Sequence, residues 1–188
     1  LDMSGGGVRQ IDGSKGATPL RPILALDTVR HVGEAVAFVV ADTMQAAKDA
    51  GELVEMDFDD KPVHLALATG GEALHTDAPD NLAFDYGRGD KDATQAALAA
   101  AAHVVKIDIP DNRIIVNSLE PRGCYAEMEE NRLHVCVNGQ GVWASKGDIV
   151  DRLKLSEDDV RVTNPDVGGA FGMKGFSYPE MMLTAQAA

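Results

Sequence analysis

The sequence has few cysteines, few aromatic residues, few positive charges and no long hydrophobic run. Two cysteines, Cys124 and Cys136, are too few for a disulfide framework and form no Cys-x-x-Cys pair, so we expect reduced, buried thiols. No apolar run approaches the roughly 18 residues of a membrane-spanning helix, which excludes a span. The start also lacks the charged and apolar regions of a signal peptide, and we expect a cytoplasmic protein.

Acidic residues outnumber basic ones by 30 to 17, which gives a formal net charge of −13. Such a surface disfavours nonspecific binding to nucleic acid or to an anionic membrane, so we expect neither partner. The histidines are scattered without the spacing of a zinc site, and we expect no metal ligand in this chain. They are His31, His64, His75, His103 and His134.

The ends of the sequence resemble internal positions of a longer protein. The chain starts without an initiator methionine, and its final "YPEMMLTAQAA" stops inside an expected helix without a cap. We therefore expect an internal fragment. Its 188 residues suffice for one large domain or two small ones.

The first half of the sequence predicts a small α/β unit. Apolar residues 35–40 favour a strand, residues 42–54 have helical spacing with Asp42 or Thr43 as N-cap, and residues 54–60 alternate as in a half-exposed strand. A glycine- and proline-rich connection over 61–92 follows. We place a domain boundary near its end, which gives domains 1–92 and 93–188.

The second half predicts an alanine-rich helix, strands and two further helices, and the fold class is therefore α+β. A hairpin turn is expected at "EENR", residues 129–132, and a helix around Ile149 to Leu155. Ser177 and Glu180 have capping-box spacing at the start of the last helix, with Pro179 in its first turn. The alanine-rich helix is expected at 92–105, and strands at 103–110, 122–129, 132–139 and 160–165.

The densest motif is "NPDVGGAFGMKG", residues 164–175. A glycine loop that leads to a helix can bind an anion through its backbone amides, or can simply let the helix pack on a strand. Lys174 stands between Met173 and Gly175, so the phosphate-binding pattern Gly-Lys-Ser/Thr is absent. The even glycine spacing also differs from the Rossmann fingerprint, although a nucleotide-binding enzyme stays an alternative.

Several segments in order resemble the large subunits of molybdenum hydroxylases, the family of xanthine dehydrogenase, aldehyde oxidase and carbon monoxide dehydrogenase. "VGGAFGMK" resembles the family stretch "GGxFGxK", and residues 29–63 resemble the α/β hammerhead domain. Residues 111–129 resemble the segment "NNRxxxNxxEPR", and residues 134–162 resemble the following strand, glutamine loop and helix. The resemblance implies a partial hammerhead domain followed by the start of a molybdopterin-binding domain.

The resemblance also implies a cofactor site. The family's glycine loop lies against the molybdenum cofactor, which corresponds to Gly169, Ala170, Phe171 and Gly172. The family's glutamine, whose amide reaches the oxo group on molybdenum, corresponds to Gln140. A glutamine amide donates a hydrogen bond without carrying charge.

Other charged residues have simpler interpretations. We expect Glu120 and Arg122 to form a structural network of ion pairs and hydrogen bonds at a strand end. Lys174 either touches a cofactor phosphate or is solvated or ion-paired.

Departures from the family limit the substrate. Members that oxidise purines carry a glutamate directly after the loop lysine, whereas this chain has Gly175, which disfavours a purine. The sequence after the lysine is closer to the carbon monoxide dehydrogenase-like branch. The family's catalytic glutamate and the carbon monoxide enzyme's reactive cysteine correspond to no residue here, so no catalytic residue is assigned in this chain.

The function implied for the longer protein is oxidation or hydroxylation of a small carbon centre with oxygen from water. The implied cofactors are molybdenum–molybdopterin, as the cytosine dinucleotide, with iron–sulfur clusters and FAD on partner domains or subunits. The isolated chain is expected to be inactive and free of cofactor. The rival hypotheses are a non-catalytic scaffold or subunit-docking module, and a nucleotide-binding enzyme.

Overall fold

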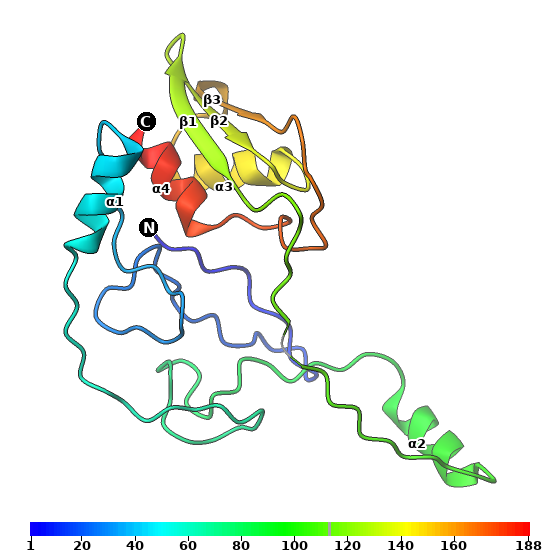
Figure 1. The fold of residues 1–188 in the computed structure, drawn as a ribbon. Coiled ribbons are helices and arrows are strands. Elements are labelled where there is room, and N and C mark those ends of the chain that lie inside the picture. The colour runs from blue at the N-terminus through cyan, green and yellow to red at the C-terminus, as the bar shows by residue number, and fades with distance from the viewer. Residues whose placement is uncertain (113) are drawn as a thin grey trace. The chain divides into compact units, whose positions relative to one another are not determined.

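The central feature of the fold is a three-stranded sheet with strand order β1-β2-β3 (Figure 1). The structure is a computed structural model that describes residues 1–112 and 114–188. Arg113, part of the family-like segment 111–129, lies outside the described residues. The elements in chain order are α1 (Met44–Glu52), α2 (Lys91–Ala100), β1 (Cys124–Glu129), β2 (Arg132–Val137), α3 (Trp143–Leu153), the 3-10 turn η1 (Glu157–Asp159), β3 (Val160–Thr163) and α4 (Pro179–Ala187).

The β2 strand has a neighbour on both sides. It pairs antiparallel with β1, with Cys124 opposite Val137, and parallel with β3, with Leu133 opposite Val160. A parallel pair needs a crossover connection, and α3 supplies it between β2 and β3. The ends of β2 and β3 therefore lead into neighbouring loops at one edge of the sheet.

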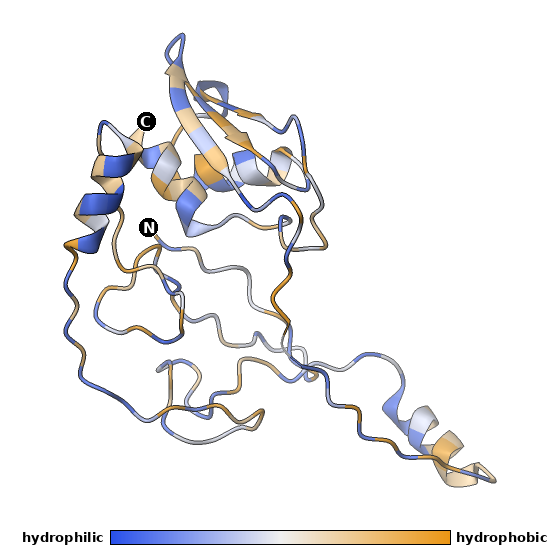
Figure 2. Cartoon of the chain, in the orientation of Figure 1, coloured by the Kyte–Doolittle hydropathy of each residue, from blue (hydrophilic) through white to orange (hydrophobic). Residues whose placement is uncertain are grey.

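The core lies between the sheet and the helices α3 and α4. The helix α4 packs against β1 and β2, α3 packs against β3, and the two helices contact each other. Val135, Ile149, Val160 and Met182 are fully buried. Figure 2 shows hydrophobic residues along these strands and helices. Burial of these side chains is the main stabilising contribution to this part of the chain.

The described chain divides into two compact units, and both are discontinuous in sequence. The first unit contains residues 1–5, 20–65 and 116–188, and so includes the sheet, α1, α3 and α4. The second unit contains residues 6–19 and 66–115, and includes α2. No helix in the described residues is long and apolar enough to cross a membrane. The division at residue 92 stays a prediction.

Several elements follow the sequence pattern. The helix α1 forms with Thr43 as its N-cap, whose side chain accepts a hydrogen bond from the backbone of Ala46. The hairpin turn at 129–132 also forms, with positive φ at Glu130 and Asn131. Both cysteines are free, as expected, but each is only half-buried.

Three predicted strands are wrong. Residues 35–40, 54–60 and 103–110 form no strand, so the expected strand–helix–strand unit contains only its helix α1. The reason is the lack of a neighbouring strand, since an extended segment satisfies its backbone hydrogen bonds only by pairing.

The predicted capping box at the last helix is also wrong. The N-cap of α4 is Tyr178, and no side chain bonds to the first turn. The Glu180 carboxylate instead accepts two hydrogen bonds from the guanidinium of Arg122. Pro179 does occupy the first turn, as predicted, because its fixed φ suits a helix start.

Candidate cofactor-binding site

The loop between β3 and α4, residues 167–175, is called the glycine loop here. Its backbone has positive φ at Gly168, Gly169, Phe171 and Gly172. Glycine adopts this conformation readily, whereas phenylalanine rarely does, so Phe171 is held in an unfavourable backbone state. The Phe171 side chain is 77% exposed and no core contact explains it. Strained residues of this kind concentrate at ligand sites.

The segment 118–120 packs against the glycine loop. The backbone N–H of Glu120 donates to the carbonyl of Gly168 at 3.2 Å. A Cβ at Gly168 would lie 2.2 Å from the Cβ of Glu120, so no larger residue fits there. A Cβ at Gly169 would lie 3.4 Å from the Cβ of the buried Ser118, whose hydroxyl donates to the Glu120 carbonyl at 2.5 Å.

Lys174 is a buried charged residue that connects three segments. Its side chain is 1% exposed, and its Nζ lies 3.0 Å from the Glu120 carboxylate. The same Nζ donates to the Val167 carbonyl at the start of the glycine loop. Its backbone carbonyl accepts a hydrogen bond from Gln140 at 3.0 Å. Of the alternatives expected for Lys174, the structure therefore has the ion-paired one.

Gln140 lies in the loop that follows β2 and meets the glycine loop around Gly175. A Cβ at Gly175 would lie 3.3 Å from the Gly172 carbonyl and 3.5 Å from the Gln140 Oε1. A cleft of about 350 Å³ opens beside this point, lined in part by Gln140, Gly141, Gly175 and Phe176. Gln140 is exposed in this cleft. The structure thus brings the predicted glutamine next to Gly175, at the end of the glycine loop.

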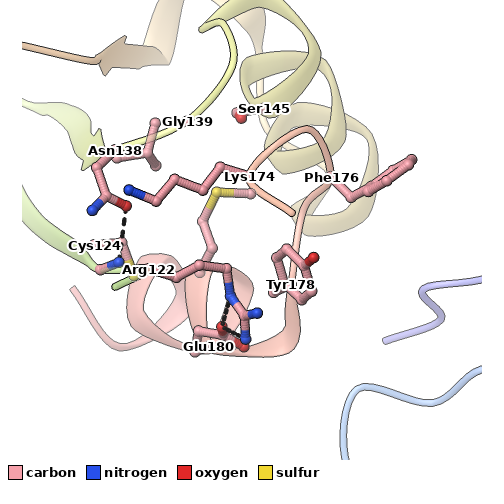
Figure 3. Close-up of a pocket in the computed structure, with 12 residues that line it drawn as sticks. Arg122, Cys124, Asn138, Gly139, Ser145, Lys174, Phe176, Tyr178 and Glu180 are labelled. Atoms are coloured by element: carbon pink, nitrogen blue, oxygen red, sulfur yellow. Dashed lines mark hydrogen bonds and ion pairs between the residues drawn. The ribbon is translucent and has the colours of Figure 1, made fainter. Parts of the chain in front are cut away.

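A second, much smaller cavity of about 40 Å³ lies behind the loop (Figure 3). Figure 3 shows Lys174 and Asn138 among its lining side chains, with Arg122 bonded to Glu180. The Arg122 guanidinium also stacks on the Tyr178 ring, with 3.7 Å from Cζ to the ring centroid. Glu120 and Arg122 are therefore both ion-paired, as predicted, but they belong to two separate pairs and not to one shared network.

Cys124 also lines this small cavity, packed against α4 through a contact with Thr184. Burial raises the pKa of the Cys124 thiol above its ordinary value, because a thiolate is poorly stabilised away from water. A thiol with a raised pKa is a poor nucleophile. The raised pKa gives Cys124 no sign of a reactive thiolate.

Residues 74–188 match the family model of the molybdopterin cofactor-binding domain. The chain belongs to this family. Residues 7–62 match a second model, the hammerhead domain of aldehyde oxidase and xanthine dehydrogenase. Both domains expected from the sequence, in the expected order, are therefore confirmed.

The relatives of this chain include the large subunit of a hydroxylase. It is 36% identical over 172 residues to the nicotine 6-hydroxylase large subunit of Paenarthrobacter nicotinovorans, covering 89% of this chain and 21% of that protein. The crystal structure of quinoline 2-oxidoreductase from Pseudomonas putida 86 matches all of this chain and 24% of that one, at 28% identity and a TM-score of 0.74. The crystal structure of the Cu,Mo-CO dehydrogenase matches 97% of this chain and 24% of that one, at 26% identity and a TM-score of 0.78.

The glycine loop fits a molybdopterin ligand in two respects. Within the described residues, the backbone N–H groups of Gly169, Ala170, Phe171 and Gly172 have no hydrogen-bond acceptor. A Cβ at Gly172 would meet no atom within 4 Å, so that side of the loop is open. Consecutive free amides in a glycine-rich turn bind ligands with acceptor oxygens, which pterins and phosphates carry.

Sequence reasoning missed the supporting role of Ser118 and the joint role of Glu120 and Lys174. A lysine inside a glycine loop and a glutamate before a proline were visible signals, but neither indicates a partner. Their pairing joins residues 54 positions apart in the chain, which only the fold specifies.

Proposed function

We propose that this chain is part of the large subunit of a molybdenum-dependent hydroxylase or dehydrogenase. The chain spans less than a quarter of the length of its nicotine-hydroxylase relative, so the activity belongs to the longer protein. The proposed reaction is oxidation of a small carbon centre with oxygen taken from water. Membership of the molybdopterin-binding family supports the cofactor class.

The observation that carries the proposal is the meeting of two loops around Gly175. The free amides of residues 169–172 lie on one loop, and the exposed amide of Gln140 lies on the other. A Cβ placed on Gly175 would lie 3.3 Å from the Gly172 carbonyl oxygen and 3.5 Å from the Gln140 Oε1, so Gly175 has the two loops on either side of it. Such an arrangement offers neutral donors to acceptor oxygens without introducing a competing charge.

Each of these residues has a distinct proposed role. The amides of Gly169, Ala170, Phe171 and Gly172 hold the molybdopterin cofactor, and Gln140 donates a hydrogen bond at the reactive end. The exposed Phe171 ring forms an aromatic wall that selects flat or small substrates. The bound cofactor supplies two-electron oxidation chemistry, which the residues of this chain do not supply themselves.

The finer assignments extend the same proposal. The cofactor is proposed to be the cytosine dinucleotide form, with iron–sulfur clusters and FAD on partner domains or subunits and a location in the cytoplasm. The carbon monoxide dehydrogenase-like branch is proposed from the residues after Lys174. Gly175 at the position of the purine enzymes' glutamate supports a substrate other than a purine.

The role of Gln140 is tested by two substitutions in the full-length protein with its partner subunits. Gln140→Ala removes the donor and should lower turnover about tenfold, which corresponds to about 1.4 kcal/mol. Gln140→Glu replaces the donor with a carboxylate and should lower turnover further, with recovery as the pH falls and the carboxyl takes a proton. Molybdenum content and turnover are measured between about pH 6 and pH 9, a window chosen to span the neutral range. Wild-type values in both variants would remove Gln140 from the site.

The substrate class is tested with Phe171→Ala. This change should leave the molybdenum content unaltered and change the relative turnover of carbon monoxide, an N-heteroaromatic ring and an aldehyde. Unchanged relative turnover would exclude Phe171 from the substrate pocket. The isolated 188-residue chain, by contrast, is expected to hold no molybdenum, because a cofactor site needs its complete surrounding structure.

A further inference from the structure

The side chain of Lys174 connects the two ends of the glycine loop. The ammonium group donates to the Val167 carbonyl, where the loop begins, and to the Glu120 carboxylate. Lys174 itself lies at the loop's end. One side chain therefore fixes the distance between the two ends of the segment that carries the free amides.

The ammonium of Lys174 has little capacity left for an outside ligand. A lysine ammonium has three donors, and two of them are engaged with oxygen atoms of the protein. The side chain is 1% exposed, whereas the Glu120 side chain is 40% exposed. A buried ammonium must keep a compensating charge beside it, so Glu120 holds Lys174 in this position.

Lys174 also acts on the second loop of the site. Its backbone carbonyl accepts the N–H of Gln140, so the position of Lys174 sets the position of Gln140. Glu120 acts on the glycine loop through its own N–H, which donates to Gly168. The pair thus bonds to both the glycine loop and the loop of Gln140.

We infer that Glu120 and Lys174 are a pair of positioning residues that hold the glycine loop and Gln140 in register for the cofactor, and that Lys174 is not a cofactor phosphate ligand. This inference rests on the proposed function. It goes beyond that proposal because neither side chain is assigned to the cofactor. Replacing either partner should accelerate cofactor loss, although neither replacement removes a direct contact with the cofactor.

Replacing Glu120 distinguishes a loop-positioning role of Lys174 from a phosphate-binding role. If Lys174 positions the loop, Glu120→Gln removes the charge that holds it, and cofactor release accelerates. If Lys174 binds a cofactor phosphate, Glu120→Gln frees the ammonium for the phosphate, and release slows or stays the same. Lys174→Met accelerates release under both roles and serves as the reference.

The experiment uses the full-length protein with its partner subunits and follows release of molybdenum at one fixed interval below each variant's melting temperature. Lys174→Met should release molybdenum about tenfold to a hundredfold faster than wild type, the range expected for loss of a charge-assisted hydrogen bond. Glu120→Gln should also release molybdenum faster than wild type. Lys174→Arg keeps the charge and the donors, so it should release molybdenum more slowly than Lys174→Met. Lys48→Met, on the exposed surface of α1, is the matched control and should release like wild type.

Every outcome bears on the inference. Slower or unchanged release from Glu120→Gln together with faster release from Lys174→Met would overturn it in favour of a phosphate ligand. Lower melting temperatures with wild-type release in all variants would overturn it in favour of a purely structural pair. If Lys174→Met fails to fold, Glu120→Gln and Lys174→Arg decide alone. Wild-type protein without molybdenum would instead refute the proposed function, which is a distinct result.

Discussion

The strand β2 and the segment 104–109 are similar in sequence and opposite in structure. Both are rich in the β-branched residues that favour strands. In β2, Val135 is fully buried between two neighbouring strands. In the segment 104–109, Val105 is 88% exposed and Ile107 is 72% exposed, and no strand forms. The difference shows that a strand needs a hydrogen-bonded neighbour as well as the right side chains.

The same contrast applies to the apolar residues of the two segments. Figure 2 shows hydrophobic residues along the extended chain after α2 as well as within the sheet. Hydrophobic residues stabilise a protein only where they leave water. The apolar residues of 104–109 therefore contribute little to the stability of this chain, and those of β2 contribute much.

The largest expected effect comes from placing one charge in each of these segments. Val135→Asp buries an unpaired carboxylate and should destabilise the chain by about 4 kcal/mol or more. Ile107→Asp, its control, places the charge in water and should change stability by less than about 0.5 kcal/mol. Equilibrium denaturation in urea measures both. Equal losses would mean that residues 104–109 are buried in solution.

A smaller effect is expected from the two units' glycines with positive φ. Gly168→Ala forces an unfavourable backbone state and brings a Cβ onto Glu120, so it should cost about 2 to 3 kcal/mol. Gly13→Ala, in the second unit, has φ of 85° but meets no atom within 4 Å, and should cost only about 1 kcal/mol. Melting temperatures of the two variants provide the comparison. A larger loss at Gly13 would contradict the close approach seen at Gly168.

A still smaller effect is expected at the ion pair between Arg122 and Glu180, because both side chains are more than a third exposed. Arg122→Ala removes this pair and the stacking on Tyr178, and should cost about 1 kcal/mol. Added salt should reduce the difference from wild type, since exposed charges are screened. A loss of several kcal/mol that does not respond to salt would show that the pair is buried in solution.

The smallest effect concerns pH. The pKa of Cys124 is raised by burial, so the folded state binds its proton more tightly than the unfolded state. This contribution to stability is complete below the ordinary thiol pKa and is lost as the pH rises through the raised value. Above about pH 9, near the ordinary thiol pKa, the free energy of unfolding should depend less on pH in Cys124→Ala than in wild type. Parallel pH curves for the two proteins would contradict burial of the thiol.

The sequence by itself determined the family, the order of the two domains and the position of α1, the hairpin turn and the sheet strands. These features depend on local patterns: a Thr43 cap, alternating apolar residues in β1 and β2, and motifs in a fixed order. It also led to wrong strands at 35–40, 54–60 and 103–110, because β propensity does not reveal whether a partner strand exists.

Only the tertiary structure decided which charged residues meet. Glu120 and Arg122 are two positions apart, yet one bonds to Lys174 and the other to Glu180. Alternate residues of a regular strand share one face, but the chain bends at residues 119 and 120, and the loops that supply the two partners return from more than 50 residues away. The meeting of Gln140 with the glycine loop has the same origin, since the parallel pairing of β2 and β3 brings the ends of both strands to one edge of the sheet.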